Sequence, residues 1–361
     1  MKRRELRLAL MTAVILGGVA AVACAQQRAA PPARPTRQQQ AGINKWVAAF
    51  RAARKDLPRR QQLVREATKH GRPLVEALAG VIEKEMRPQL KRYCNQFTAQ
   101  AKTATAKQAT KANVAEVAKL RQQVLGLQGG ANFTKENIVA VADPAMQRLA
   151  QIILVDRNAV LARSKKLQAE RDRITQLGKL WEQCGVYLFK TAADNNERTR
   201  EPPNFEKYLQ GEEELAVGMA APMPAQTRAV LAANAKLAGQ VEAEEARAIA
   251  ALNLTRMLLG LPPVVIDLKL AAAARGHSQD MKRLAFFGHD SPVRGKSSPW
   301  DRAALAGTKA NAENIYRGVT DGHAANEAWF HSPPHQKNML GPYTRVGIGR
   351  AGTYYTEMFG K

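Results

Sequence analysis

The sequence has few cysteines, few aromatic side chains and a shortage of negative charge. Its 361 residues include 3 Cys, aromatic residues make up 6%, and 55 Lys and Arg stand against 31 Asp and Glu, which gives a formal net charge of +24. Three cysteines exclude a dense disulfide scaffold. No apolar run after residue 25 approaches the roughly 18 residues that cross a bilayer. The hydrophobic content of 45% excludes wholesale disorder, and the length predicts about two domains.

The positive charge is concentrated near the start of the chain. Residues 26–125 carry 21 Lys and Arg against 6 Asp and Glu, a net charge of +15, whereas residues 241–361 carry a net charge of +4. A basic helical region of this kind predicts contact with an anionic surface, or else is a solvated face of a basic protein. No zinc-finger spacing, aromatic RNA-binding platform or helix-turn-helix is present, which argues against specific binding of nucleic acid.

Residues 1–25 have the pattern of a signal peptide. Lys2, Arg3 and Arg4 precede a small, apolar stretch, and Ala-Cys-Ala at 23–25 is a typical cleavage site. The pattern predicts an exported protein that is periplasmic, cell-surface or extracellular. An alternative is a lipoprotein that is processed at Cys24, although Ala21 stands where such sites usually have Leu.

A mostly helical region is predicted for residues 43–193. Apolar residues recur there at spacings of three and four, as in Ile43, Trp46 and Phe50. Pro58, Pro73 and Pro88 are expected to divide this region into several helices.

The segments on either side of this region differ in composition. Residues 26–42 are rich in Pro, Gln and Arg and are predicted to form an extended linker. Residues 194–240 contain several prolines and an acidic run, which predicts a connector with a short helix after Thr227. If Cys24 is removed with the leader, Cys94 and Cys184 remain. In an exported chain they could form one disulfide, or they could be two buried thiols.

Residues 241–361 are expected to carry the chemistry. Five of the six His lie in this segment, and imidazole is both a frequent metal ligand and an acid or base near neutral pH. Helices are predicted at 242–259, 268–284, from 298 and at 323–330, with Asp267 as an N-cap. Alternating residues predict paired antiparallel strands at 346–349 and 354–359. Helices followed by strands indicate an α+β fold.

A series of ordered motifs in this segment resembles a known family. The motifs are LNLTRMLLGLPPVVID, HSQDM, FFGHDSP, SPWDRA, AENIYRG, AWFHSPPHQKNML, YTRVGIG and YYTEMFG. Over about residues 245–361 the chain resembles a bacterial member of the CAP superfamily, which comprises cysteine-rich secretory proteins, antigen 5 and pathogenesis-related protein 1. The resemblance implies a C-terminal α-β-α sandwich in an exported protein, here preceded by the helical region. It also implies binding of lipids or sterols in some members and of proteins in others.

The resemblance further implies a cleft lined by two His and two acidic residues, which binds zinc or another divalent cation in some members. Matched by motif, the cleft residues are His289, Glu313 and His335, and Ser332 stands where the second Glu is found. His277 is a possible fourth member. Two imidazoles and one carboxylate could hold Zn²⁺ with an open water position, or could be a hydrogen-bonded structural centre.

The histidines of this segment also allow other arrangements. His323, Glu327 and His331 recur every four residues and could clamp a metal from one helix face, although exposed faces often look so. Prolines at 333–334 break the helix between His331 and His335, which excludes a zinc-peptidase helix there.

Two classes of function follow. The first is a non-enzymatic envelope or extracellular module that binds a lipid, peptide or wall-polymer ligand. The second is a metal-assisted hydrolase or peptidase of the cell envelope. Ser291 near His289 is conceivable as a nucleophile, but no G-x-S-x-G elbow is present. Residues 241–361 contain no Cys, which excludes a cysteine mechanism there.

Overall fold

The structure is a computed structural model that describes residues 35–108, 113–130, 132–194, 202–221, 223–318 and 321–361. Residues 37–361 form one compact unit, which is described below by itself. The predicted signal peptide, the lipoprotein alternative at Cys24 and most of the predicted linker lie outside the described residues.

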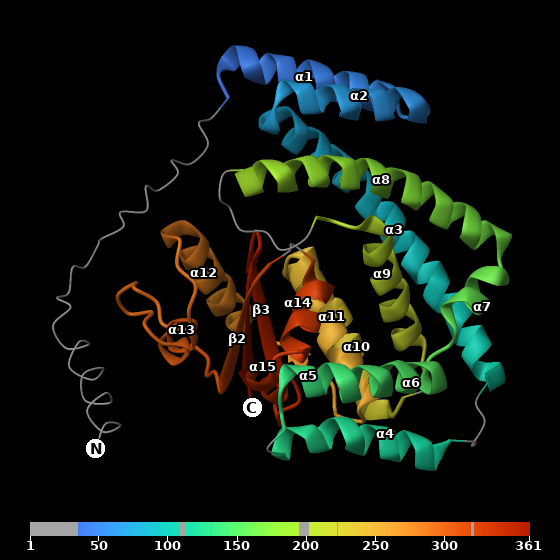
Figure 1. Ribbon diagram of the computed structural model, residues 1–361, viewed down its shortest axis with the longest axis vertical. Helices are drawn as coiled ribbons and strands as arrows, with labels where there is room; N and C mark the ends of the chain where they lie inside the picture. The colour runs from blue at the N-terminus through green and yellow to red at the C-terminus, as the bar shows by residue number, and fades with distance from the viewer. Residues whose placement is uncertain (1–34, 109–112, 131, 195–201, 222, 319–320) are drawn as a thin grey trace, which may run out of the picture. The chain divides into compact units, whose positions relative to one another are not determined.

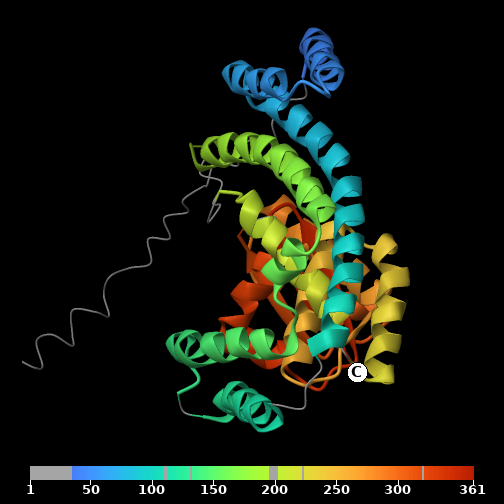
Figure 2. The ribbon, with the colours of Figure 1, turned by 90° about the vertical axis from the view of Figure 1, so that its right-hand side faces the viewer.

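Long helices make up the first part of the described chain. They are α1 (Arg37–Ala52), α2 (Leu57–His70), α3 (Arg72–Gln108) and α8 (Lys165–Asp194). Helices α3 and α8 lie side by side, as Figures 1 and 2 show. Phe50, Leu78 and Leu180 are buried in the cluster that joins α1, α2, α3 and α8. The predicted mostly helical region is confirmed.

Helix α1 begins earlier than the sequence predicted. It starts at Arg37, so the last six residues of the expected extended linker are helical. Gln and Arg are good helix formers, and Ile43, Trp46 and Phe50 anchor the rest of α1 on the cluster. Packing of its C-terminal half therefore stabilises α1, and the helix extends toward the N-terminus into a polar segment.

The prolines act in two ways. Pro58 and Pro73 lie in the first turns of α2 and α3, where a missing backbone N–H leaves no hydrogen bond unmade. Pro88 lies inside α3, so the prediction that it divides two helices is wrong. An interior proline costs about 3 kcal/mol, and the burial of Met86 and Tyr93 on either side of it offsets that cost.

Four shorter helices connect α3 to α8. They are α4 (Val114–Gly126), α5 (Lys135–Asn137), α6 (Asp143–Ile153) and α7 (Arg157–Ala162), with a π-helical turn at Ile138–Ala142. Within the described residues, Lys135–Ala162 is the one helical stretch that is long and apolar enough to cross a membrane, by length and composition alone. This finding corrects the prediction that no stretch after residue 25 approaches the length and apolar character needed to cross a bilayer. Ile138 and Leu149 of this stretch are buried in a core shared with the C-terminal elements.

The predicted connector is also more helical than expected. Residues 194–240 contain α9 (Phe205–Ala220) and α10 (Ala225–Leu237), so Thr227 lies inside a helix. Phe205, Leu209 and Val217 form a buried stripe on α9 against α3, which explains why this segment folds as a helix. Short 3₁₀ turns follow α4 and α10 at Leu127–Gly129 and Ala238–Gln240. The domain boundaries predicted at 193 and 240 stay predictions.

The C-terminal part is an α-β-α sandwich. Its elements are α11 (Ala243–Leu258), β1 (Val265–Ile266), α12 (Leu268–Leu284), α13 (Pro299–Leu305), β2 (Ala312–Arg317), α14 (Gly322–Phe330), α15 (Pro333–Met339), β3 (Arg345–Ala351) and β4 (Tyr354–Gly360). The strand order is β1-β3-β4-β2, with β1 parallel to β3 and the other pairs antiparallel. Helix α12 covers one face, while α11 and α14 cover the other. This confirms the predicted α+β class and the paired strands near the C-terminus.

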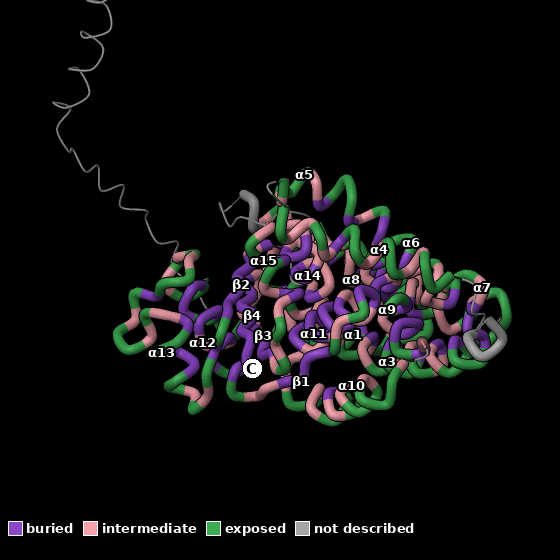
Figure 3. Tube along the Cα trace, turned by 90° about the horizontal axis from the view of Figure 1, so that it is seen from below, coloured by how far each residue is buried: buried purple, intermediate pink, exposed green. Residues whose placement is uncertain are grey.

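Helix α12 packs closely on β3 because two glycines face it. A Cβ atom at Gly347 or Gly349 would lie 2.1 or 1.8 Å from the backbone nitrogens of Ala271 and Arg275. The buried colour in Figure 3 is concentrated along β2, β3 and β4 between these helices.

The two cysteines that follow the leader are free thiols. Cys94 on α3 is half-buried and Cys184 on α8 is buried, and they belong to different clusters. Of the two alternatives, the structure has unpaired thiols. Burial raises the pKa of Cys184 to about 12, so this thiol stays protonated and unreactive.

Candidate functional site

The predicted site residues lie around the edge strand β2. In the described sheet β2 pairs with β4 alone. Glu313 and Asn314 are neighbours in this strand, so their side chains point to opposite faces of the sheet. Glu313 contacts α13, whereas Asn314 contacts α15. The two side chains therefore begin two separate polar networks.

Helix α12 and the loop after it set the position of His289. Asp267 caps α12 by accepting hydrogen bonds from the backbone N–H groups of Lys269 and Leu270 at 2.9 and 3.1 Å, as predicted. The helix ends at Leu284, and Ala285 takes a left-handed conformation with φ of 55°. This residue turns the chain out of the helix, and His289 follows in the loop.

Glu313 is held by an arginine and a histidine. Its carboxylate accepts hydrogen bonds from Arg302 Nη2 at 2.9 Å (Oε1) and 2.7 Å (Oε2), and Oε1 also lies 2.9 Å from His289 Nδ1. The Glu313 and Arg302 side chains are 1% and 2% exposed, whereas the His289 side chain is 50% exposed. A buried ion pair thus anchors an imidazole that is open to solvent.

His277 is a positioning group behind this pair. It is fully buried on α12, and its Nε2 donates to the backbone carbonyl of Gly288 at 2.9 Å. Burial lowers the pKa of His277, so the ring is neutral near pH 7 and its buried Nδ1 has no hydrogen-bond partner. The predicted fourth member therefore lies next to the site, where it fixes the loop that carries His289.

His335 comes from the other side of β2. It lies in the first turn of α15, and its backbone carbonyl accepts a hydrogen bond from Asn314 Nδ2 at 3.2 Å. Burial, and secondly the neighbouring His289, lower the pKa of His335, so this imidazole is neutral near pH 7. The structure thus places His289 and His335 near one another.

These side chains do not fit a three-ligand metal site. Both carboxylate oxygens of Glu313 accept from Arg302, and His289 Nδ1 is used by the same carboxylate. Across the described residues, no group of three or more His, Cys, Asp and Glu side chains is arranged to hold a metal ion. Zinc binding by His289, Glu313 and His335 therefore stays a prediction that this arrangement does not favour.

A second buried network lies on the opposite face of the sheet. Glu357 on β4 pairs across the strands with Asn314, whose Nδ2 donates to Glu357 Oε2 at 2.8 Å. Asn338 on α15 donates to Asn314 Oδ1 at 2.8 Å. Burial raises the pKa of Glu357 to about 8, although Asn314 and Arg256 act to lower it. This glutamate is therefore mostly protonated at neutral pH.

Sequence reasoning missed Arg302, Asn338 and Glu357 as members of these networks. Arg302 and Asn338 lie inside motifs that carried the family resemblance, SPWDRA and HQKNML. Their chemistry was not assigned because an arginine and an asparagine in short helices are usually exposed. No signal in the sequence marked Glu357 as buried beyond its place in an alternating strand.

The remaining histidines are engaged elsewhere. Burial lowers the pKa of His323 to about 4. His331 Nε2 lies 2.8 Å from Asp143 Oδ1 on α6, and Glu327 pairs with Lys207 at 3.2 Å. His331 and Glu327 therefore bond to different partners, which does not favour the predicted metal clamp on α14. Ser291 is buried, and its Oγ accepts the backbone N–H of Val293 at 3.2 Å, which is a turn contact.

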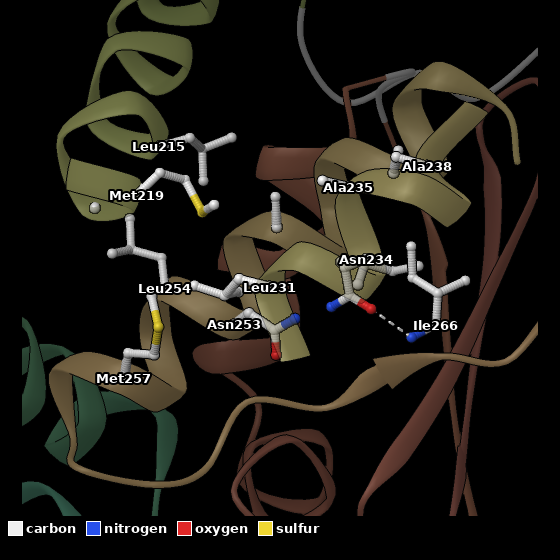
Figure 4. Close-up of a pocket in the computed structure, with 14 residues that line it drawn as sticks. Leu215, Met219, Leu231, Asn234, Ala235, Ala238, Asn253, Leu254, Met257 and Ile266 are labelled. Atoms are coloured by element: carbon white, nitrogen blue, oxygen red, sulfur yellow. Dashed lines mark hydrogen bonds between the residues drawn. The ribbon is translucent and has the colours of Figure 1, made fainter. Parts of the chain in front are cut away.

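An apolar pocket of about 210 Å³ lies between α9, α10, α11 and β1 (Figure 4). Fourteen residues line it, and none of them is charged: Leu215, Gly218, Met219, Leu231, Asn234, Ala235, Ala238, Ala246, Ile249, Ala250, Asn253, Leu254, Met257 and Ile266.

Neither of the two asparagines that line the pocket presents a free polar group to it. The amides of Asn234 and Asn253 both bond to the backbone of residues 264–266, at 2.8–3.0 Å. With their donors and acceptors used in this way, the pocket presents an apolar surface, and Met219 and Ala235 of its lining are exposed to solvent.

An α-β-α sandwich with His289 and Glu313 at its edge strand is the arrangement that the motif resemblance implied. Residues 249–359 match the model of the Cysteine-rich secretory protein family, CAP. The C-terminal third of the chain is therefore a CAP domain, which confirms the resemblance seen in its motifs.

Two curated relatives each match about a third of the chain. The chain is 37% identical to the "Uncharacterized protein YkwD" of Bacillus subtilis (strain 168) over 124 residues, which is 33% of this chain and 48% of YkwD. The "Uncharacterized membrane protein YlbC" of the same strain is 35% identical over 108 residues, which is 30% of this chain and 31% of YlbC. The chain thus spans about half of the first relative and about a third of the second.

Two solved structures also resemble it. One is an extracellular protein containing a SCP domain from Bacillus anthracis str. Ames, with 32% identity, 33% of this chain and 40% of that chain covered, and a TM-score of 0.32. The other is an outer surface protein from Borrelia burgdorferi, with 20% identity, 31% and 88% coverage and a TM-score of 0.29.

Proposed function

We propose that the protein is a non-enzymatic ligand-binding protein of the cell envelope, and that the pocket between α9, α10 and α11 receives an apolar chain of its ligand. The observation that carries this proposal is the pocket's lining, in which both asparagine amides are already bonded to the backbone. A wholly apolar cavity of about 150 Å³ stays dry and binds benzene. The larger pocket here, with Met219 and Ala235 exposed at its lining, suits an alkyl chain whose polar head stays in water.

The predicted export of the chain supports a place in the cell envelope. The leader has the pattern of a signal peptide, and a similar solved protein is described as extracellular. The Arg302 contacts of Glu313 leave this carboxylate unsuited to act as a general base, so the binding role is preferred to hydrolysis.

The test is binding of a dansyl-labelled undecanoic acid to the full chain, followed by fluorescence. Ala235→Phe places a ring in the pocket and is expected to weaken binding at least about tenfold, which corresponds to about 1.4 kcal/mol. Ala232→Phe is the matched control, because Ala232 is also exposed on α10 but does not line the pocket. Equal binding by the wild type and both variants, or no binding by the wild type, would contradict the proposal.

We also propose that the basic helices at the start of the described chain contact an anionic surface. Residues 37–70 carry nine Lys and Arg against two acidic residues, and eight of the nine are exposed: Arg37, Lys45, Arg51, Arg54, Lys55, Arg59, Arg65 and Lys69. Attraction of exposed charges to an anionic layer is worth about 1 kcal/mol for each Lys or Arg near the surface and weakens with salt.

Co-sedimentation with phosphatidylglycerol vesicles tests this second role. The variant Arg54→Glu/Lys55→Glu is expected to pellet less than the wild type at low salt. Lys165→Glu/Lys166→Glu is the control, because it makes the same charge change at the start of α8, where both lysines are exposed. The same loss in both variants would indicate a net-charge effect, and no loss in either would exclude the role of α1 and α2.

A further inference from the structure

We propose that the Arg302 guanidinium takes the place of a divalent cation beside His289 and Glu313, so that a built-in charge assembles this site. This site at β2 is separate from the apolar pocket and from the ligand proposed for that pocket.

The surroundings of Arg302 resemble those of a bound cation. Its Nη2 has three oxygens within 2.9 Å, which are both carboxylate oxygens of Glu313 and the backbone carbonyl of His289. Its Nη1 donates to the backbone carbonyls of Lys296 and Ser297 at 3.0 and 3.3 Å. Carboxylate and carbonyl oxygens are also the ligands of hard cations. Arg302 Nη2 thus binds the carboxylate of Glu313 and the backbone of the loop at His289, as a metal ion would.

The balance of charge favours a single positive charge here. Glu313 and Arg302 are both buried, and a buried ion is tolerated when it is paired and hydrogen-bonded. Arginine stays protonated at all accessible pH values. One carboxylate and one guanidinium sum to zero. A divalent ion added to this set would leave two uncompensated positive charges in a largely buried site.

The carboxylate has little left to offer a metal. Oε1 accepts from both Arg302 and His289, and Oε2 accepts from Arg302. An entering ion would have to displace a guanidinium that five hydrogen bonds hold in place. Arg302 therefore occupies the carboxylate of Glu313 that a metal ion would need.

The proposal predicts that removing Arg302 creates a zinc site. The full chain is titrated with Zn²⁺, and bound zinc is measured by mass spectrometry together with the melting temperature. The wild type is expected to hold far less than one zinc per chain, with no change in its melting temperature. Arg302→Ala is prepared in the presence of Zn²⁺, and it is expected to bind zinc at least about tenfold more tightly than the wild type and to melt higher with zinc than without.

Two further variants give the test its specificity. His289→Ala in the Arg302→Ala background is expected to abolish the gain of zinc. Arg294→Ala removes an exposed arginine of the same loop and is expected to behave as the wild type. The proposal is overturned if the wild type holds one zinc per chain that His289→Ala removes. It is also overturned if Arg302→Ala gains no zinc, or if zinc fails to support its folding.

Discussion

Each face of the C-terminal sheet carries one buried glutamate on its own strands, and the two side chains have different partners. On the α12 face, Glu313 meets the guanidinium of Arg302 and the imidazole of His289. On the opposite face, Glu357 accepts one hydrogen bond from Asn314, and its Oε1 has no hydrogen-bond partner. Arg256 lies nearby but donates to the backbone carbonyls of Pro262, Met339 and Gly341.

The difference shows that two buried carboxyl groups can differ in whether a cation is bonded to them. Both glutamates are almost fully buried, and they lie on strands that pair with one another. A cation bonded directly to the carboxylate offsets the cost of burying its charge. Where the cation is bonded elsewhere, the group keeps its proton, as the raised pKa of Glu357 indicates.

The largest effect is expected from removing the cation. Arg302→Met leaves Glu313 buried without its partner, which should lower the free energy of unfolding by about 3–5 kcal/mol in the absence of metal. Chemical denaturation at neutral pH measures the change. Arg302→Met/Glu313→Gln is expected to regain most of the loss. If the double variant is no more stable than the single one, the buried charge is not the cause.

The next effect concerns the packing of the α12 face. Gly349→Ala places a methyl group against the backbone of Arg275, which should cost about 3 kcal/mol because neither backbone can yield easily. Gly276→Ala is the matched control in α12, where a Cβ meets no other atom within 4 Å. It is expected to be neutral or stabilising. Thermal unfolding of both variants measures the contrast, and an equally mild effect of both would contradict the close packing.

The third effect depends on pH and lies on the opposite face. The pKa of Glu357 in the folded protein, about 8, is above the value of an unfolded glutamate, so the folded state binds the proton more tightly. Its contribution to stability is complete below about pH 4 and declines up to about pH 8, at a limit of about 1.4 kcal/mol per pH unit. Glu357→Gln should remove this decline. Urea unfolding at several pH values measures the free energy of unfolding of both proteins. A difference between the wild type and the variant that stays constant with pH would refute the prediction.

The smallest effect is expected at a neutral contact of the α12 face. Ser278 Oγ donates to the carbonyl of Gly349 at 2.7 Å and lies 2.9 Å from Thr356 Oγ1. Ser278→Ala should cost about 1 kcal/mol, without the pH dependence seen at Glu357. A loss as large as that of Arg302→Met would mean that hydroxyl contacts, rather than charge, govern this face.

Much of the C-terminal fold could be predicted from local patterns. The cap at Asp267, the end of α12 before His289 and the pairing of β3 with β4 follow from signals within a few residues. The helices α9 and α10 could not be predicted as well, because Pro and Glu in their sequence indicate a connector. Contact of α9 with α3, more than a hundred residues away, decides the outcome.

The sequence by itself determined which residues lie around the edge strand β2. The ordered motifs bring His289, Glu313 and His335 to β2, and the glycines of YTRVGIG let α12 approach the sheet. Only the tertiary structure decided their chemistry. Whether Glu313 meets a metal or Arg302, and whether Glu357 keeps its proton, depends on distances of about 3 Å across separate elements. Electrostatic interactions in a buried site change sharply over such distances, and spacing along the chain does not specify them.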